Sequence, residues 1–121
     1  MTDVCVPISV LADCITETKA EIDAAGLVAP IVGHVGDGNF HVCFLVDPDA
    51  PEELTQVRTL AERLAERAIA LGGTCTGEHG VGYGKSSLLL LEYGEESVDV
   101  MRRLKSALDP DGIMNPGKIL P

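Results

Sequence analysis

Residues 27–46 read LVAPIVGHVGDGNFHVCFLV, and this stretch decides the fold. Two apolar segments, Leu27–Gly33 and Phe40–Val46, flank the polar and glycine-rich residues Gly36–Asn39. Gly, Asp and Asn accept the positive φ angles that a tight turn requires. The pattern therefore predicts two antiparallel strands joined by a turn, with Pro30 placing the first strand at a sheet edge or at a bulge.

A strand and a helix are expected before this hairpin. Val4–Val6 reads as a short strand, and Ser9 can cap a helix that Gly26 ends. The apolar positions between them follow helical spacing, with Thr18 in register: Leu11, Cys14, Ile15 and Ile22.

A second helix and a fourth strand are expected after the hairpin. Pro51 suits the entry of a helix, Gly72 and Gly73 stop it, and Thr74–Thr76 begins a strand. The apolar stripe of this helix comprises Leu54, Val57, Leu60, Ala61, Leu64, Ala68 and Leu71. The order β-α-β-β-α-β predicts an α+β fold of ferredoxin-like type, with both helices on one face of the sheet.

The last third of the chain is predicted to be helical. One helical segment covers Lys85–Tyr93 and ends at Gly94, a second covers Glu95–Leu108, and Ile113–Pro121 reads as a coil. We expect a single domain over residues 1–121, with a helical hairpin and a tail appended to the sheet.

The composition excludes several classes of partner. The chain has 9 Lys+Arg against 19 Asp+Glu, a formal charge of −10, which argues against nucleic acid and against an anionic membrane surface. The longest apolar runs, Val42–Val46 and Leu88–Leu91, are too short to span a bilayer, and no signal peptide is visible. The cysteines lack metal-type spacing and read as small buried hydrophobes: Cys5, Cys14, Cys43 and Cys75. We expect a soluble protein of the cytoplasm, or of an organelle matrix.

Glycine and histidine are concentrated in two short stretches. Nine of the 13 glycines lie within Gly33–Gly38 and Gly72–Gly84, and all three histidines lie in or beside these segments. If the chain reverses between His34 and His41, their imidazoles lie close together on one face of the sheet and can share a cation. The alternative is that one histidine caps the turn and the other is a surface residue.

The second glycine-rich loop carries Glu78 and His79. If this loop folds across the end of the sheet, Glu78 reaches the histidine pair, and two histidines with one carboxylate suit Zn, Mn or Fe with open coordination positions. His79 would then be unligated and placed to act as a general base. Without the first loop, both residues read as plain loop residues.

Phosphate-binding motifs fail in this loop. Gly84-Lys85-Ser86 supplies the end of the pattern G-x-x-x-x-G-K-[ST], but His79 stands where the first glycine is required. The pattern G-x-G-x-x-G also fails, because the third glycine comes one residue early. The chain itself therefore offers no dinucleotide-binding fingerprint.

These motifs together resemble a known family. The segments are GHVGDGNFH at 33–41, GTCTGEHGVG at 73–82, LDP at 108–110, MNPGK at 114–118 and the opening DVCVPIS at 3–9. They are similar to the C-terminal domain of FAD-linked oxidases, and especially to the D-lactate dehydrogenase (cytochrome) and glycolate-oxidase-like flavoenzymes. The resemblance covers essentially the whole chain.

The resemblance implies a role for five residues. It implies that His34, His41 and Glu78 bind a divalent metal, and that His79 is the catalytic base which takes the hydroxyl proton of a 2-hydroxy acid. It also implies that Asn115 lies near the flavin of FAD, which accepts the hydride. Relatives acting on longer dicarboxylates often have His-x-Asn where this chain has His41-Val42-Cys43, so a small monocarboxylate such as lactate is favoured.

The family's flavin is held mainly by an N-terminal domain that has no counterpart in this sequence. We therefore expect a metal-bearing substrate domain that needs an FAD-binding domain or subunit and does not oxidise a 2-hydroxy acid alone. The alternative is a stand-alone ferredoxin-like module that self-associates without catalysis. In either case, a domain shaped to cover a partner is expected to expose apolar surface and to form homo-oligomers when isolated.

Overall fold

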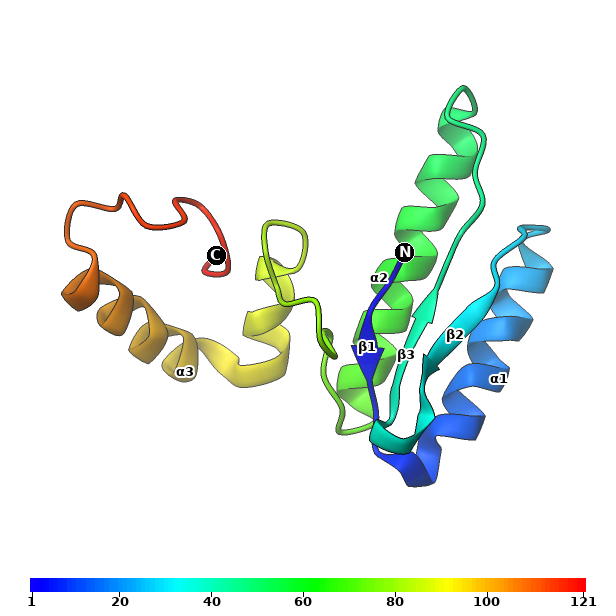
Figure 1. Cartoon of the computed structure of the whole chain (residues 1–121), viewed down its shortest axis with the longest axis horizontal. Coiled ribbons are helices and arrows are strands. Elements are labelled where there is room, and N and C mark those ends of the chain that lie inside the picture. Colours follow the sequence, from blue (N-terminus) through cyan, green and yellow to red (C-terminus); the bar gives the residue numbers. More distant parts are fainter. The chain divides into compact units, whose positions relative to one another are not determined.

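A computed structural model describes all 121 residues of the chain. The residues form two compact units, Met1–His79 and Gly80–Pro121. The first unit holds a small antiparallel sheet and two helices, and the second holds a helix and the tail (Figure 1).

The sheet has three antiparallel strands in the order β1-β3-β2. They are β1 (Val4–Cys5), β2 (Ile31–His34) and β3 (Asn39–Val42). The strand β3 therefore lies in the centre, and all four of its residues are buried. The α+β class and the central hairpin are confirmed.

The hairpin strands are shorter than predicted. The regular ladder covers four residues on each side, and only an isolated bridge between Val28 and Leu45 continues the pairing. Pro30 explains the interruption, because it has no N–H to donate to a neighbouring strand. Its carbonyl still accepts a hydrogen bond from the backbone N–H of Cys43, at 2.9 Å.

The expected fourth strand, Thr74–Thr76, is not a strand. Thr74 makes a single antiparallel bridge to Cys5 of β1, with hydrogen bonds of 2.8 and 3.2 Å in the two directions. Beyond this bridge, the chain bends and its polar groups bond to the side chain of Asp3 instead of to a neighbouring backbone. The pairing therefore ends after one residue.

The turn of the hairpin forms at the predicted residues. A short 3₁₀ helix η1 covers Val35–Asp37, and Gly38 follows it with φ 78°, in the left-handed region. A Cβ at Gly38 would also lie 2.0 Å from the carbonyl oxygen of Val6. Glycine is thus required here for two separate reasons.

Two helices pack together beside the sheet: α1 (Ile8–Ala24) and α2 (Pro51–Ala70). They lie behind the three strands in the view of Figure 1. Gly26 ends α1 as predicted, with φ 70°, but the predicted cap by Ser9 is wrong, because the helix begins at Ile8 with Pro7 at its N-cap. Residues of both predicted stripes are buried, Leu11, Cys14, Thr18 and Ile22 on α1 and Leu64 and Ala68 on α2.

The second unit contains α3 (Ser86–Leu108), which is broken at Gly94, where φ is 76° and ψ is 164°. The predicted division into two helical segments is confirmed, and their arrangement as a hairpin remains a prediction. No helix of the chain is long and apolar enough to cross a bilayer.

The tail after α3 contains turns and bends but no helix or strand, as predicted, and hydrogen bonds hold its turns. The carboxylate of Asp109 accepts hydrogen bonds from the backbone N–H groups of Ile113 and Met114, at 3.0 and 2.9 Å. The N–H of Ile119 donates to the carbonyl of Gly82 at 2.7 Å, and so joins the tail to the start of the same unit.

Candidate metal centre

The strand register brings His34 and His41 to one face of the sheet. His34 pairs with Asn39, and His41 pairs with Val32, so the two histidines are diagonal neighbours rather than directly opposed. Diagonal neighbours on one face remain within reach of long side chains. Their ring centroids are 6.3 Å apart. The predicted proximity of the pair is confirmed.

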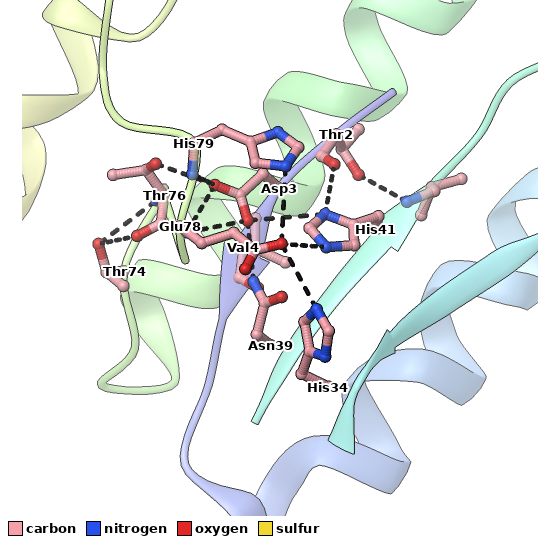
Figure 2. A network of polar contacts seen from close by, with 11 residues as sticks. Thr2, Asp3, Val4, His34, Asn39, His41, Thr74, Thr76, Glu78 and His79 are labelled. Atoms are coloured by element: carbon pink, nitrogen blue, oxygen red, sulfur yellow. Dashed lines mark hydrogen bonds and ion pairs between the residues drawn. The ribbon is translucent and has the colours of Figure 1, made fainter. Parts of the chain in front are cut away.

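Glu78 reaches this pair from the loop that follows Thr74. Its Oε1 lies 3.1 Å from Nε2 of His41 and 3.6 Å from Nε2 of His34 (Figure 2). Thr74 pairs with β1, and β1 lies next to the central strand β3. The loop that follows Thr74 therefore starts one strand away from His41. His41 is buried, whereas His34 and Glu78 are exposed.

The three side chains offer donor atoms of the kinds that bind divalent metals. One ligand atom from each lies within 4.8 Å of the others. A tetrahedral ion with ligands at about 2.0–2.1 Å holds its ligand atoms about 3.3 Å apart. The two distances to Glu78, 3.1 and 3.6 Å, straddle this spacing.

The tautomer of His41 is compatible with metal binding. Its Nδ1 lies 3.1 Å from the carbonyl oxygen of Thr2, which can only accept a hydrogen bond, so Nδ1 carries the proton in that bond. Nε2 faces the carboxylate of Glu78 at 3.1 Å, a gap that either a proton on Nε2 or a metal ion can bridge. A carbonyl that fixes the outer ring nitrogen is also typical of histidine ligands to metals.

His79 lies beside the cluster rather than in it. Its ring stacks on that of His41, with centroids 5.0 Å apart and an angle of 14° between the planes. Its Nε2 lies 3.6 Å from Oε1 of Glu78, but its ring nitrogens do not join the group of convergent ligand atoms. The side chain of His79 is 45% exposed, so it can exchange a proton with solvent.

Two buried polar residues support the cluster, and sequence reasoning did not find them as site residues. Asp3 is 2% exposed and accepts four donors: Asn39 Nδ2 at 2.8 Å, Thr76 Oγ1 at 3.0 Å, Glu78 N at 3.0 Å and His79 N at 2.9 Å. Asn39, which was expected to be a turn residue, is 5% exposed and also donates to the carbonyl of Val4. The only local signal was a charged residue directly before an apolar strand.

The hydrogen bonds to Asp3 determine its protonation. Burial alone would raise the pKa of this carboxyl, but the donors from His79, Asn39, Glu78 and Thr76 outweigh burial and hold its pKa well below the ordinary value. Asp3 is therefore a buried anion, and its Oδ1 lies 3.6 Å from Nδ1 of His41.

The remaining predicted site residue, Asn115, lies in the second unit. Its backbone adopts φ 48°, a left-handed conformation that is uncommon outside glycine. Cys43, which follows β3, is half-buried, and none of the four cysteines forms a disulfide.

Comparison with known proteins shows the family of the chain. Residues 1–119 match the family described as FAD linked oxidases, C-terminal domain. The chain is 54% identical to a probable mitochondrial D-lactate dehydrogenase of Danio rerio, over 98% of this chain and 24% of that protein. It is 47% identical to the mitochondrial D-lactate dehydrogenase [cytochrome] of Arabidopsis thaliana, over 100% of this chain and 21% of that protein. It is 45% identical to the glycolate oxidase subunit GlcD of Bacillus subtilis, over 72% of this chain and 18% of that protein.

The class follows from the family match over nearly the whole chain, and the chain has an antiparallel α+β unit with a His-His-Glu cluster. The chain belongs to the family of FAD-linked oxidase C-terminal domains. It spans about a fifth to a quarter of the length of the first curated relatives that it matches.

Proposed function

We propose that this chain is the metal-bearing substrate domain of an FAD-dependent dehydrogenase that oxidises a small D-2-hydroxy acid such as D-lactate. The observation that carries the proposal is the convergence of His34, His41 and Glu78, with His79 stacked beside them. The names of the D-lactate dehydrogenase relatives support the substrate class. The half-buried Cys43 supports a small monocarboxylate, since it offers no amide to a second carboxylate.

In this proposal, His34, His41 and Glu78 hold one Zn, Mn or Fe ion. The ion, when bound, supplies Lewis acidity towards the hydroxyl and carboxylate oxygens of the substrate. The buried His41 provides the fixed ligand, because the Thr2 carbonyl holds its ring, and the exposed His34 and Glu78 close around the ion.

His79 is the proposed general base. Its Nε2 faces the cluster, and it takes the hydroxyl proton of the substrate there. Stacking on His41 keeps the plane of the His79 ring fixed, while its exposed side lets the proton pass to solvent.

The proposal places the flavin mainly outside these 121 residues. The glycine-rich loops lack a dinucleotide-binding fingerprint, and Asn115 offers one contact to a flavin rather than a site for FAD. An FAD-binding domain or subunit is thus the proposed partner, and the chain alone is expected to be inactive. The ferredoxin-like description is also a proposal, supported by the bridge that places Thr74 beside β1. The proposed location is the cytoplasm or an organelle matrix. The mitochondrial names of two relatives support the organelle matrix.

Metal analysis of the purified chain tests the centre of the proposal. We expect about one Zn, Mn or Fe per chain, lost in His34→Ala and retained in His79→Ala, which removes the base but no ligand. Equal metal content in the wild-type chain and in His34→Ala would refute the ligand set. Robust oxidation of D-lactate by the pure chain, without added flavoprotein, would refute the need for a partner.

One observation favours a second candidate, a self-associating module. Four apolar side chains of the hairpin and its flanks are between 53 and 64% exposed: Val28, Val32, Val35 and Leu45. Such a surface suits a partner or a second copy of the chain. Sedimentation of the metal-free chain measures self-association. A chain that forms dimers and binds no metal would leave only this candidate.

A further inference from the structure

We propose that Asp3 is the positioning residue of the candidate metal centre, because its carboxylate fastens the Glu78–His79 loop to the sheet. This inference rests on the proposed function, since it concerns the same site. Asp3 touches no substrate and ligates no metal in this proposal. It acts through the backbone that carries Glu78 and His79.

The contacts of Asp3 join two parts of the unit. From the loop, it accepts the backbone N–H groups of Glu78 and His79 and the hydroxyl of Thr76. From the central strand, it accepts the amide of Asn39. Figure 2 shows these bonds converging on Asp3 beside His41. The ligand Glu78 and the base His79 are therefore held through the same carboxylate.

Only an acceptor fits at this position. The four groups named above all donate to Asp3, and an ionised carboxylate offers about four lone-pair sites and no hydrogen to clash. An asparagine would turn an NH₂ group towards donors and leave some of them unpaired in a buried site. Unpaired buried donors are costly, so the loop would move away from the sheet.

The orientation of Asn39 follows from the same charge. Its Nδ2 faces two acceptors, Oδ1 of Asp3 and the carbonyl of Val4, while its buried Oδ1 accepts no hydrogen bond. The reverse orientation would set that oxygen against the carboxylate. The orphaned oxygen is thus tolerated because the Asp3 contact fixes the side chain.

Gly77 completes the arrangement. A Cβ at this position would lie 1.8 Å from Nδ2 of Asn39 and 2.8 Å from Oδ1 of Asp3. The loop therefore approaches the Asp3–Asn39 pair as closely as a backbone without a side chain allows. This close approach is what brings the next residue, Glu78, over His41.

The test compares Asp3→Asn with Asp13→Asn in the full chain. Both variants remove one negative charge, but Asp13 is exposed on α1 and is not one of the groups that bond the loop. Titration calorimetry with zinc alone measures affinity, and amide hydrogen exchange follows Glu78 and His79. The visible spectrum of the cobalt-loaded chain reports ligand geometry, which a general loss of stability in a folded variant would not alter.

We expect Asp3→Asn to bind zinc about 10–100-fold more weakly, which is the usual effect of removing a group that supports metal ligands. Its Glu78 and His79 amides should exchange faster, its cobalt spectrum should change, and Asp13→Asn should match the wild-type chain. If Asp3→Asn does not fold, Thr76→Val removes a single donor and should weaken zinc binding by about threefold to tenfold.

Failure of the inference differs from failure of the proposed function. If the wild-type chain binds zinc and Asp3→Asn binds it equally well, the role of Asp3 is overturned and the metal site stands. If Thr76→Val binds zinc with the affinity of the wild-type chain, the role of Asp3 is overturned in the same way. If the wild-type chain binds neither zinc nor cobalt, the proposed metal site falls and the assignment of Asp3 falls with it.

Discussion

Replacing Gly77 with alanine tests the close packing under the candidate site. The backbone of Gly77 is not in the left-handed region, so alanine meets no conformational strain there. Its Cβ would instead lie 1.8 Å from Nδ2 of Asn39 and 2.9 Å from Cγ of the same side chain. Asn39 or the loop must therefore move by more than an ångström.

The energetic cost follows from the bonds that this movement breaks. Asn39 donates to the Asp3 carboxylate at 2.8 Å and to the Val4 carbonyl at 2.9 Å. A bond to a charged group contributes about 1.5–3 kcal/mol and a neutral bond about 0.5–1.5 kcal/mol. The alanine regains up to about 1 kcal/mol through the unfolded chain. We expect Gly77→Ala to lower the free energy of unfolding by about 2–3 kcal/mol.

Gly36→Ala is the matched control. Gly36 lies in the other glycine-rich loop, has no positive φ, and has open space where a Cβ would be. Alanine there should stabilise the chain by about 0.4–1 kcal/mol. Urea unfolding followed by far-UV circular dichroism measures both variants. At a slope of about 1 kcal/mol per molar urea, their midpoints should differ by about 3 M. Equal midpoints would refute the close approach of the loop to Asn39.

The remaining predictions concern stability elsewhere and metal removal. Arg67 is 11% exposed at its side chain and pairs with Glu21 at 2.7 Å, so Arg67→Ala should cost about 2–3 kcal/mol in urea unfolding. Arg63→Ala also breaks a pair with Glu21, but its side chain is 58% exposed and the cost should stay below about 1 kcal/mol; equal costs would contradict this account. The pKa of Asp109 is lowered by the hydrogen bond from Lys105, against desolvation, and further by the amides of Met114 and Ile113. This carboxylate therefore stabilises the folded state at pH values above its unfolded pKa of about 3.9. Asp109→Asn should therefore unfold at a lower temperature than the wild-type chain at pH 7, and this difference should shrink as the pH falls below about 4. Tyrosine fluorescence from Tyr83 and Tyr93 follows the unfolding. A difference that persists unchanged at low pH would contradict the lowered pKa of Asp109. Zinc at about 100 times its dissociation constant should stabilise the chain by about 2.7 kcal/mol, and a chelator should reverse the shift in melting temperature; an unchanged melting temperature would count against the site.

Local patterns predicted the helices and the hairpin. The apolar spacing of Leu11, Cys14 and Ile22 predicted α1, and those three residues are buried. The left-handed glycines at 38 and 94 end or break elements where expected. Such features depend on neighbours a few residues away, which is why the sequence reveals them.

The single-residue pairing at Thr74, where a fourth strand was wrongly predicted, and the support of the site could not be predicted in this way. Thr74–Thr76 has strand-like composition, but the polar groups that follow the Thr74 bridge bond to the Asp3 carboxylate rather than to a strand. The histidine pair was predicted because both residues flank one turn. Asp3 was missed as a site residue because its partners lie 36 to 76 residues away, and no local spacing indicates them.

The distance along the chain between Asp3 and His79 also bears on synthesis. Their hydrogen bond joins residues 76 positions apart. Closing a flexible loop of that length costs about 4 kcal/mol of chain entropy from its length alone. The hydrogen bond between Asp3 and His79 therefore forms only when the intervening strands and helices have folded. On a ribosome adding about 5–20 residues per second, the N-terminal strand waits several seconds before Glu78 and His79 emerge. His34 and His41 are thus exposed to metal ions before Glu78, the proposed carboxylate ligand, is made, and the complete cluster appears only when the first unit is finished.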